Sequence, residues 1–422
     1  MEFAAYLGIL RIIMVFAIIA LCQKLKRSLE FSLVAASFVL ALSCGIWPQD
    51  WGLIVAKSCT DITLIALLCA MASILLLSGL MDKSGQSHRL AEAMRRHISS
   101  TRVRLLFFPA LIGLLPVPGG AIFSCPMVDE VAKDLPVSAE HKGTINYWFR
   151  HVWECIWPLY PGFVLFSALV EKNPLEIIAY NWPIWLAGMA AGWIFLLRGI
   201  RIEGGQAAIH AEGGSRWTAL REASSILTAL AGAFLLRLLL PSLPPAFPFA
   251  IGFCLGSALC FFMNGMSFGT VRDILTSSRT LGILRVVIAI FMFKAVMIQS
   301  GVMQSVGLIM HNSLIALFIA CMLLPLVGGM FTGIMVGLVG ITFPILIPLV
   351  QQAGVWDQRL VWLGMAMMFG YIGQMISPVH VCLVVTCRFF DVHLFDVMRR
   401  VGWPCLFLAL AAVGWFFLHV RF

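Results

Sequence analysis

Apolar stretches of membrane-spanning length follow one another along almost the whole chain. A helix needs about 20 predominantly apolar residues to cross the hydrocarbon core of a bilayer. The 422 residues are 61% hydrophobic and 12% charged, and soluble domains carry about twice that share of charge. We therefore expect an all-α polytopic membrane protein without a sizeable soluble domain. The predicted membrane segments are residues 4–22, 31–48, 60–81, 105–131, 146–170, 177–198, 222–241, 247–264, 284–303, 314–350, 360–387 and 402–420.

The basic residues predict which loops face the cytoplasm. The net charge of +9 comes from Lys and Arg that gather in certain loops, as they do in the cytoplasmic loops of membrane proteins. This explanation of the charge leaves no reason to expect a nucleic-acid partner. We expect a multi-pass protein of the cell inner (cytoplasmic) membrane, with the N- and C-termini outside. The basic loops are residues 23–30, 82–104, 198–221, 265–283 and 388–401.

Two of the apolar segments, 105–131 and 314–350, contain residues that interrupt helices. The first carries Pro116, Pro118 and two glycines near its middle, and both residue types destabilise a helix interior. If either segment crossed the membrane once, the basic loops would fall on opposite sides. We therefore expect two re-entrant hairpins, each formed by two half-membrane helices around a Pro-Gly tip. A kinked ordinary span is the alternative interpretation.

The two interrupted segments also resemble each other in sequence. Leu114-Leu115-Pro116 corresponds to Leu323-Leu324-Pro325, and Gly119-Gly120 corresponds to Gly328-Gly329, with one common offset (325−116 = 328−119 = 209). Farther along, Trp157-Pro158 falls opposite Ser377-Pro378. The order of segments around these matches is the same in both halves. The chain is therefore expected to contain an internal repeat.

Each predicted repeat holds five spans and one hairpin, and an odd number of spans inverts the second repeat relative to the first. Inverted repeats with interrupted helices are typical of secondary transporters. Spans one to three and seven to nine are expected to form a scaffold domain, and the remaining segments a transport domain. The predicted divisions are the first repeat at 1–198, a cytoplasmic linker at 199–221 and the inverted second repeat at 222–422.

This arrangement resembles the ion-transporter superfamily, which includes divalent-anion/sodium symporters and citrate and gluconate permeases. The tip "PVPGG" and the stretch "NYWFRHVWECIWPLYPG", residues 146–162, are similar to a prokaryotic integral membrane family of unassigned substrate within it. The resemblance implies a homodimer and an elevator-like movement of the transport domain. The tips lack the paired Ser-Asn-Thr of the dicarboxylate members, so that specificity is not carried over.

The hairpin tips are candidate binding sites for an anion. A helix that begins at a tip presents unpaired backbone N–H groups and the positive end of its dipole. Glycine lets the backbone approach a ligand closely, although glycine that serves only a tight turn is the alternative interpretation. Hydroxyl groups near the tips can add hydrogen bonds. The candidates are Gly119, Gly120, Ser124, Gly328, Gly329 and Thr332.

The span that follows the first hairpin contains ionisable residues and prolines. Arg150 and Glu154 are four residues apart, so they share one helical face. Ionisable residues at membrane depth mark functional sites. We expect Glu154 to carry a proton or contact a sodium ion, and Arg150 to bind a carboxylate. Pro158 frees backbone carbonyls that suit a cation. An internal Arg150–Glu154 pair is the alternative.

The corresponding span of the second repeat supplies Gln374, Ser377 and His380. At the repeat offset Gln374 falls opposite Glu154, which predicts an amide facing a carboxylate. His380 titrates near neutral pH, so it could couple proton movement. Packing is the alternative role for such a histidine.

We expect secondary active transport of a small anionic solute, such as a carboxylate, coupled to Na⁺ or H⁺. Membrane lipid and a second copy of the chain are the other expected partners. A cation/proton antiporter on the same scaffold is the alternative. An intramembrane enzyme is remote, because no HExxH motif, catalytic Ser-His pair or second acidic ligand supports it. The 12 cysteines show no CxxC spacing, so we expect no disulfide, metal site or organic cofactor.

Overall fold

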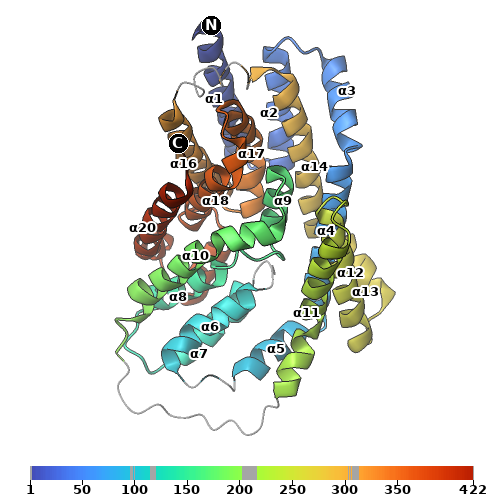
Figure 1. Cartoon of the computed structure of the whole chain (residues 1–422). Coiled ribbons are helices and arrows are strands. Elements are labelled where there is room, and N and C mark those ends of the chain that lie inside the picture. Colours follow the sequence, from blue (N-terminus) through green and yellow to red (C-terminus); the bar gives the residue numbers. More distant parts are fainter. Residues whose placement is uncertain are drawn as a thin grey trace.

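The structure, a computed structural model, is built from helices (Figure 1). It describes residues 2–95, 98, 100–114, 120–201, 216–302, 304, 306 and 313–421, and this part contains no strand. The chain is an all-helical, multi-pass membrane protein. Eight helices among the described residues are long and apolar enough to cross a bilayer. These eight are α1, α4, α11, α12, α14, α16, α17 and α20.

The helices follow the expected segments closely. The first half comprises α1 (Glu2–Lys24), α2 (Leu29–Ser43), α3 (Pro48–Cys59), α4 (Ile62–Lys83), α5 (Gln86–Arg95), α6 (Thr101–Gly113), α7 (Ala121–Val131), α8 (Ala139–His151), α9 (Pro161–Val170) and α10 (Pro174–Gly192), which continues as a short π-helix (Trp193–Leu197). The second half comprises α11 (Arg216–Leu239), α12 (Ala246–Met263), α13 (Phe268–Leu275), α14 (Ser278–Gln299), α16 (Leu314–Thr332), α17 (Met335–Gln352), a 3-10 turn (Trp356–Gln358), α18 (Arg359–Met375), α19 (Val381–Phe390) and α20 (Leu394–His419).

Short polar side chains define several helix starts. Asp61 accepts a hydrogen bond from the backbone N–H of Thr63 and so caps α4. Asn173 caps α10 in the same way, and Pro174 occupies the first helical position. Such caps satisfy backbone donors that have no partner within the helix. They fix where each helix begins and therefore which residues reach the middle of the molecule.

The packing of helices in one half is repeated in the other. Helix α1 packs on α2 as α11 packs on α12, and α2 packs on α14 as α12 packs on α4. Likewise α6 packs on α8 as α16 packs on α18, and α7 packs on α19 as α17 packs on α9. Helices of each half therefore pack against helices of the other half in equivalent pairs.

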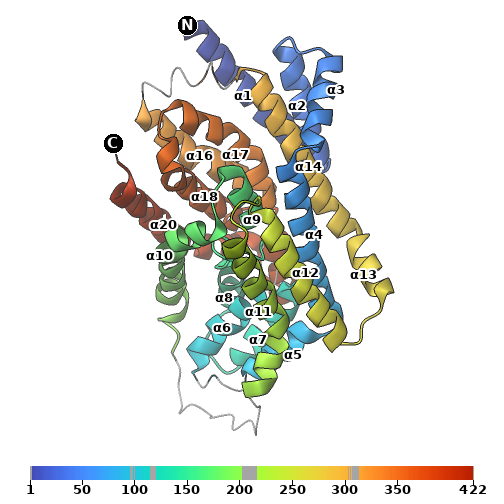
Figure 2. The same cartoon turned by 45° about the vertical axis from the view of Figure 1, so that its right-hand side comes forward.

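The helices form two groups. Helices α1–α4 and α11–α14 lie on one side of the molecule, and α6–α10 and α16–α20 lie on the other (Figures 1 and 2). The α6–α7 pair approaches the middle from the end that holds α5, and the α16–α17 pair approaches from the opposite end (Figure 2). The first group holds the helices of the expected scaffold domain, and the second holds those of the expected transport domain.

The second helical pair differs from the predicted hairpin. Helix α16 continues through Pro325 and ends at Thr332, and Gly333 forms the turn with a φ of 61°. The predicted tip at Gly328-Gly329 was therefore wrong. The helices have 19 and 18 residues, about the length of a full membrane span rather than half of one. In the first pair, α6 and α7 are short, with 13 and 11 residues.

Close helix packing explains why glycines occupy 328 and 329. A Cβ at Gly329 would lie 2.7 Å from the backbone nitrogen of Gln374 and would overlap the carbonyl oxygen of Gly370. A Cβ at Gly328 would lie 2.5 Å from Cγ2 of Thr342. These glycines let α16 cross α18 and α17 at short range. The sequence repeat alone does not distinguish glycines at a helix crossing from glycines in a turn.

Candidate functional site

Two interrupted helices meet near the middle of the molecule. Helix α8 ends at His151 and α9 begins at Pro161, and α18 ends at Met375 and α19 begins at Val381. Proline disfavours the helical conformation in the residue before it and cannot donate a backbone hydrogen bond. Pro158, Pro161 and Pro378 therefore favour the interruptions. The predicted breaks in both spans are present.

The two interrupted helices contact each other through buried polar side chains. Gln374 Nε2 donates a hydrogen bond to Glu154 Oε2 at 2.7 Å. The Tyr147 hydroxyl lies 2.9 Å from His380 Nδ1. Glu154 and Gln374 are 5% and 1% exposed, so this contact is buried. The amide therefore faces the carboxylate, as the repeat offset predicted.

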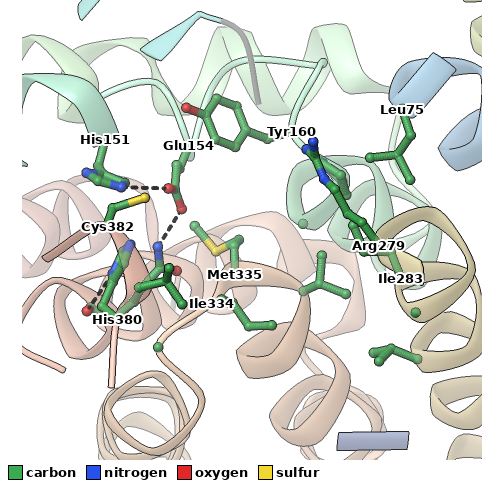
Figure 3. Close-up of a pocket in the computed structure, with 18 of the residues that line it drawn as sticks. Leu75, His151, Glu154, Tyr160, Arg279, Ile283, Ile334, Met335, His380 and Cys382 are labelled. Atoms are coloured by element: carbon green, nitrogen blue, oxygen red, sulfur yellow. Dashed lines mark hydrogen bonds and ion pairs between the residues drawn. The ribbon is translucent and has the colours of Figure 1, made fainter. Parts of the chain in front are cut away.

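Glu154, Gln374 and His380 form part of the wall of a cavity of about 470 Å³. His151, Glu154, His380 and Cys382 gather on one side, and Arg279, Ile283 and Leu75 lie across from them (Figure 3). The second wall comes from α14 and α4, so the cavity lies between the two groups of helices. The turn after α16 contributes Gly333, Ile334 and Met335 to the same cavity.

The structure brings together four of the residues predicted to bind substrate or ion. Arg150, Glu154, Gln374 and His380 all line the cavity. Gly119 lies outside the described residues. The other candidates, which do not line it, are Gly120, Ser124, Pro158, Gly328, Gly329, Thr332 and Ser377.

Arg150 links the cavity to the start of α7. The residue is buried, and a Cβ at Gly120 would lie 2.6 Å from its Nη2 atom. Glycine at position 120 therefore lets the guanidinium approach the first turn of α7, whose N-terminal end carries partial positive charge. The proximity of these two positive groups favours an anion over a cation at this part of the site.

The two hydroxyl candidates bond to backbone groups of their own helices. Ser124 donates to the carbonyl oxygen of Gly120 at 3.2 Å, and Thr332 donates to that of Gly328 at 2.9 Å. Serine and threonine commonly make this bond to the residue four positions earlier in a helix. Both hydroxyls are therefore engaged by the backbone of their own helix segment and not by the cavity.

Side chains of the interrupted segments cap the first helix of each pair. The indole N–H groups of Trp153 and Trp157 donate to the carbonyl oxygens of Ala110 and Leu114, each at 2.8 Å. At the corresponding position of the second repeat, Ser377 donates to the carbonyl oxygen of Met330 at 2.7 Å. This capping role was not predicted from the sequence, in which Ser377 is a candidate ligand.

Replacing Ser377 with alanine is expected to destabilise the protein by about 1 kcal/mol, the usual value of one buried hydrogen bond. Solute uptake by the folded variant should remain near that of the wild type. Thermal unfolding of purified protein and uptake into proteoliposomes would measure the two effects. A variant of wild-type stability that takes up no solute would indicate that Ser377 binds the solute or the ion.

Several cavity residues were not predicted from the sequence. Arg279 falls in the predicted cytoplasmic loop 265–283, and Cys382, Tyr160 and Gly333 are not among the predicted site residues. The sequence could have indicated Gly333, because it directly follows the candidate Thr332 in a stretch rich in small residues. Nothing in the sequence indicated that Arg279 lines the cavity, because its position depends on how α14 packs on the other helices.

The comparisons with known proteins agree with this architecture. A family model described as "Protein of unknown function (DUF401)" matches residues 9–420. The chain belongs to this family. No curated protein matches the DUF401 chain. Among solved structures, it is similar to the YdaH transporter of Alcanivorax borkumensis, whose crystal structure is described as revealing an unusual topology. The two share 15% identity over 88% of each chain, with a TM-score of 0.57, so the likeness concerns the fold.

Proposed function

We propose that this DUF401 protein is a secondary active transporter that moves a small anionic solute across the inner membrane, coupled to Na⁺ or H⁺. The observation that carries the proposal is the buried contact between Glu154 and Gln374, in a cavity where two interrupted helices meet. Interrupted helices at equivalent positions of two repeats are the usual location of substrate and ion sites in such transporters. The fold shared with a transporter supports the same conclusion.

Glu154 is the proposed coupling group. A buried carboxylate in a membrane protein is costly unless it is neutralised by a proton or a cation. Gln374 donates to Oε2 and leaves Oε1 as an acceptor or ligand. The imidazole of His151 lies beside the carboxylate, with its Nε2 3.9 Å from Oε1. These contacts allow the carboxylate to exchange a coupling ion with the cavity.

Two arginines support an anionic solute. Arg150 and Arg279 line the same cavity from different groups of helices. A guanidinium binds a carboxylate through two parallel hydrogen bonds, which gives both affinity and orientation. A solute in contact with both residues would bridge the two groups of helices. Apolar residues such as Leu75, Ile283 and Ile334 surround the remaining volume, which favours an organic anion over a small inorganic one.

The elevator-like movement, the homodimer and the re-entrant insertion of the α6–α7 pair belong to the same proposal. We place the family in the ion-transporter superfamily, with both termini outside and the basic loops in the cytoplasm. The cavity between the two groups of helices supports such a movement, because sliding one group along the other would carry Glu154 and Gln374 across the membrane. Cysteine accessibility on either side of Leu114 would test the insertion.

A cation/proton antiporter on the same scaffold is the alternative function. It requires Glu154 and the carbonyls freed by the helix breaks, but not the arginines. The presence of Arg150 in the cavity wall therefore favours an anion. An intramembrane enzyme is a remote third possibility, which a hydrolysis assay run beside the uptake assay would test.

Organic anions are expected to stabilise the purified protein against heat. A ligand at 100 times its dissociation constant adds about 2.7 kcal/mol to the free energy of unfolding. Screening carboxylates with and without Na⁺, at two pH values, would identify the solute class. Arg279→Gln should lower the affinity for the stabilising anion by roughly 10- to 100-fold, because charged hydrogen bonds contribute about 1.5–3 kcal/mol.

The matched control for this screen is Arg272→Gln, which changes an exposed arginine on α13 outside the cavity. Its response to the anion should equal that of the wild type. Stabilisation by Na⁺ alone, with no anion effective, would favour the antiporter. Equal anion affinity in wild type and Arg279→Gln would remove this arginine from the site.

A further inference from the structure

We propose that the polar side of the cavity is a binding site for a divalent transition metal ion of the Zn²⁺ class. His151, His380 and Cys382 place their ligand atoms within 4.8 Å of one another. They come from the ends of two interrupted helices that are separated by more than half of the chain, so the Cys and His spacing along the sequence gave no indication of the cluster. Figure 3 shows the three side chains beside Glu154.

The hydrogen bond made by His151 Nδ1 leaves the lone pair of Nε2 available to bind a metal. Its Nδ1 lies 2.7 Å from the carbonyl oxygen of Tyr147, and a carbonyl can only accept, so Nδ1 carries the proton. The neutral ring then has its lone pair on Nε2. This atom points toward Glu154 Oε1, 3.9 Å away. A metal-binding histidine is usually oriented by such a bond from its other nitrogen.

His380 has the same tautomer for a different reason. The Tyr147 hydroxyl has a single proton, which it donates to the carbonyl oxygen of Met375 at 3.1 Å. It must therefore accept from His380 Nδ1, 2.9 Å away. The carbonyl oxygen of Gln374, 3.3 Å from Nδ1, requires the same donor. The lone pair of His380 is therefore also on Nε2. Tyr147 thus orients both imidazoles for one ligand.

Glu154 completes a set of four donors. Gln374 occupies Oε2, and Oε1 remains near His151 Nε2. Ligand atoms of a tetrahedral zinc ion, with bonds of about 2.0–2.3 Å, lie roughly 3.3–3.8 Å apart. The separations of up to 4.8 Å among the ligand atoms of His151, His380 and Cys382 exceed this range by roughly 1–1.5 Å, so metal binding would draw the three side chains together. Two nitrogens, one thiolate and one carboxylate suit Zn²⁺ and exclude Mg²⁺ and Ca²⁺.

The charge balance and the access to the site are also favourable. A thiolate and a carboxylate together neutralise a divalent ion, so the occupied cluster adds no net charge beside Arg150 in the same cavity wall. Cys382 is partly exposed and lines the cavity, so a metal can reach the cluster. The site itself does not depend on the transport reaction. If the proposed function holds, a bound metal would compete with the coupling ion for Glu154.

Cobalt(II) tests the site directly in purified full-length protein. Co²⁺ replaces Zn²⁺ in tetrahedral sites, and a thiolate ligand adds a charge-transfer band in the near ultraviolet. We expect a saturable band at about one Co²⁺ per chain, displaced by Zn²⁺ and unaffected by Mg²⁺. Cys382→Ser should abolish the band and weaken metal binding by more than roughly 100-fold.

The control is Cys387→Ser, on the same helix α19 but outside the cavity wall, which should keep the band. Glu154→Gln should weaken binding and retain the thiolate band, which checks the cluster without removing the sulfur. No saturable band, a band that survives Cys382→Ser, or a band lost in Cys387→Ser would overturn the proposal. None of these outcomes requires transport, so failure of the metal site and failure of the proposed function are separable.

Discussion

Glu154→Gln is expected to reduce ion-coupled uptake in proteoliposomes by roughly 10- to 100-fold, because a charged hydrogen bond or ion contact contributes about 1.5–3 kcal/mol. Glutamine has nearly the same shape, and its carbonyl oxygen can still accept from Gln374 Nε2, which now donates to Oε2 at 2.7 Å. The variant loses the group that binds or releases a proton or a sodium ion. Uptake driven by an imposed ion gradient is the measurement.

The thermal-unfolding midpoint of Glu154→Gln should stay at or above that of the wild type, because a buried charge is replaced by a neutral group of similar volume. Glu176→Gln is the matched control, since Glu176 is half exposed and pairs with Lys172 at 2.6 Å. An exposed pair of this kind contributes little. Wild-type coupled flux in Glu154→Gln would exclude this carboxylate from the mechanism.

Gly329→Ala is expected to destabilise the protein by about 3 kcal/mol, at the upper end of the cost of overpacking. Its new Cβ would meet the backbone of α18, at 2.7 Å from the nitrogen of Gln374. A backbone cannot avoid this contact by rotating, as a flexible side chain could. The two helices must separate, which also displaces the Gln374 amide from Glu154. Thermal unfolding and uptake should therefore fall together.

Gly414→Ala supplies the comparison for a helical glycine without this constraint. No atom lies within 4 Å of the position that its Cβ would occupy in α20. The substitution should leave stability unchanged or raise it by up to about 1 kcal/mol, because alanine favours a helix over glycine. Equal behaviour of the two alanine variants would contradict the close crossing of α16 and α18.

The contact between Glu154 and Gln374 was predictable from the sequence, but its detailed geometry was not. Glu154 and Gln374 could be matched because the repeat places Trp157-Pro158 opposite Ser377-Pro378. A repeat preserves the position of a residue along its helix, and symmetry then brings the two positions together. The same repeat misplaced the second turn, because glycines that allow helices to cross look like glycines that form a tip.

The sequence by itself determined the all-helical membrane fold, its two repeats and the two interrupted helices, since hydrophobic length and proline position act locally along the chain. Only the tertiary structure decided that α16 turns at Gly333, that Ser377 caps a helix, and that Arg279 reaches the cavity. It alone also brought His151 and His380 to Cys382. Those contacts depend on how distant helices cross, and no local pattern of residues encodes the depth and angle of a crossing.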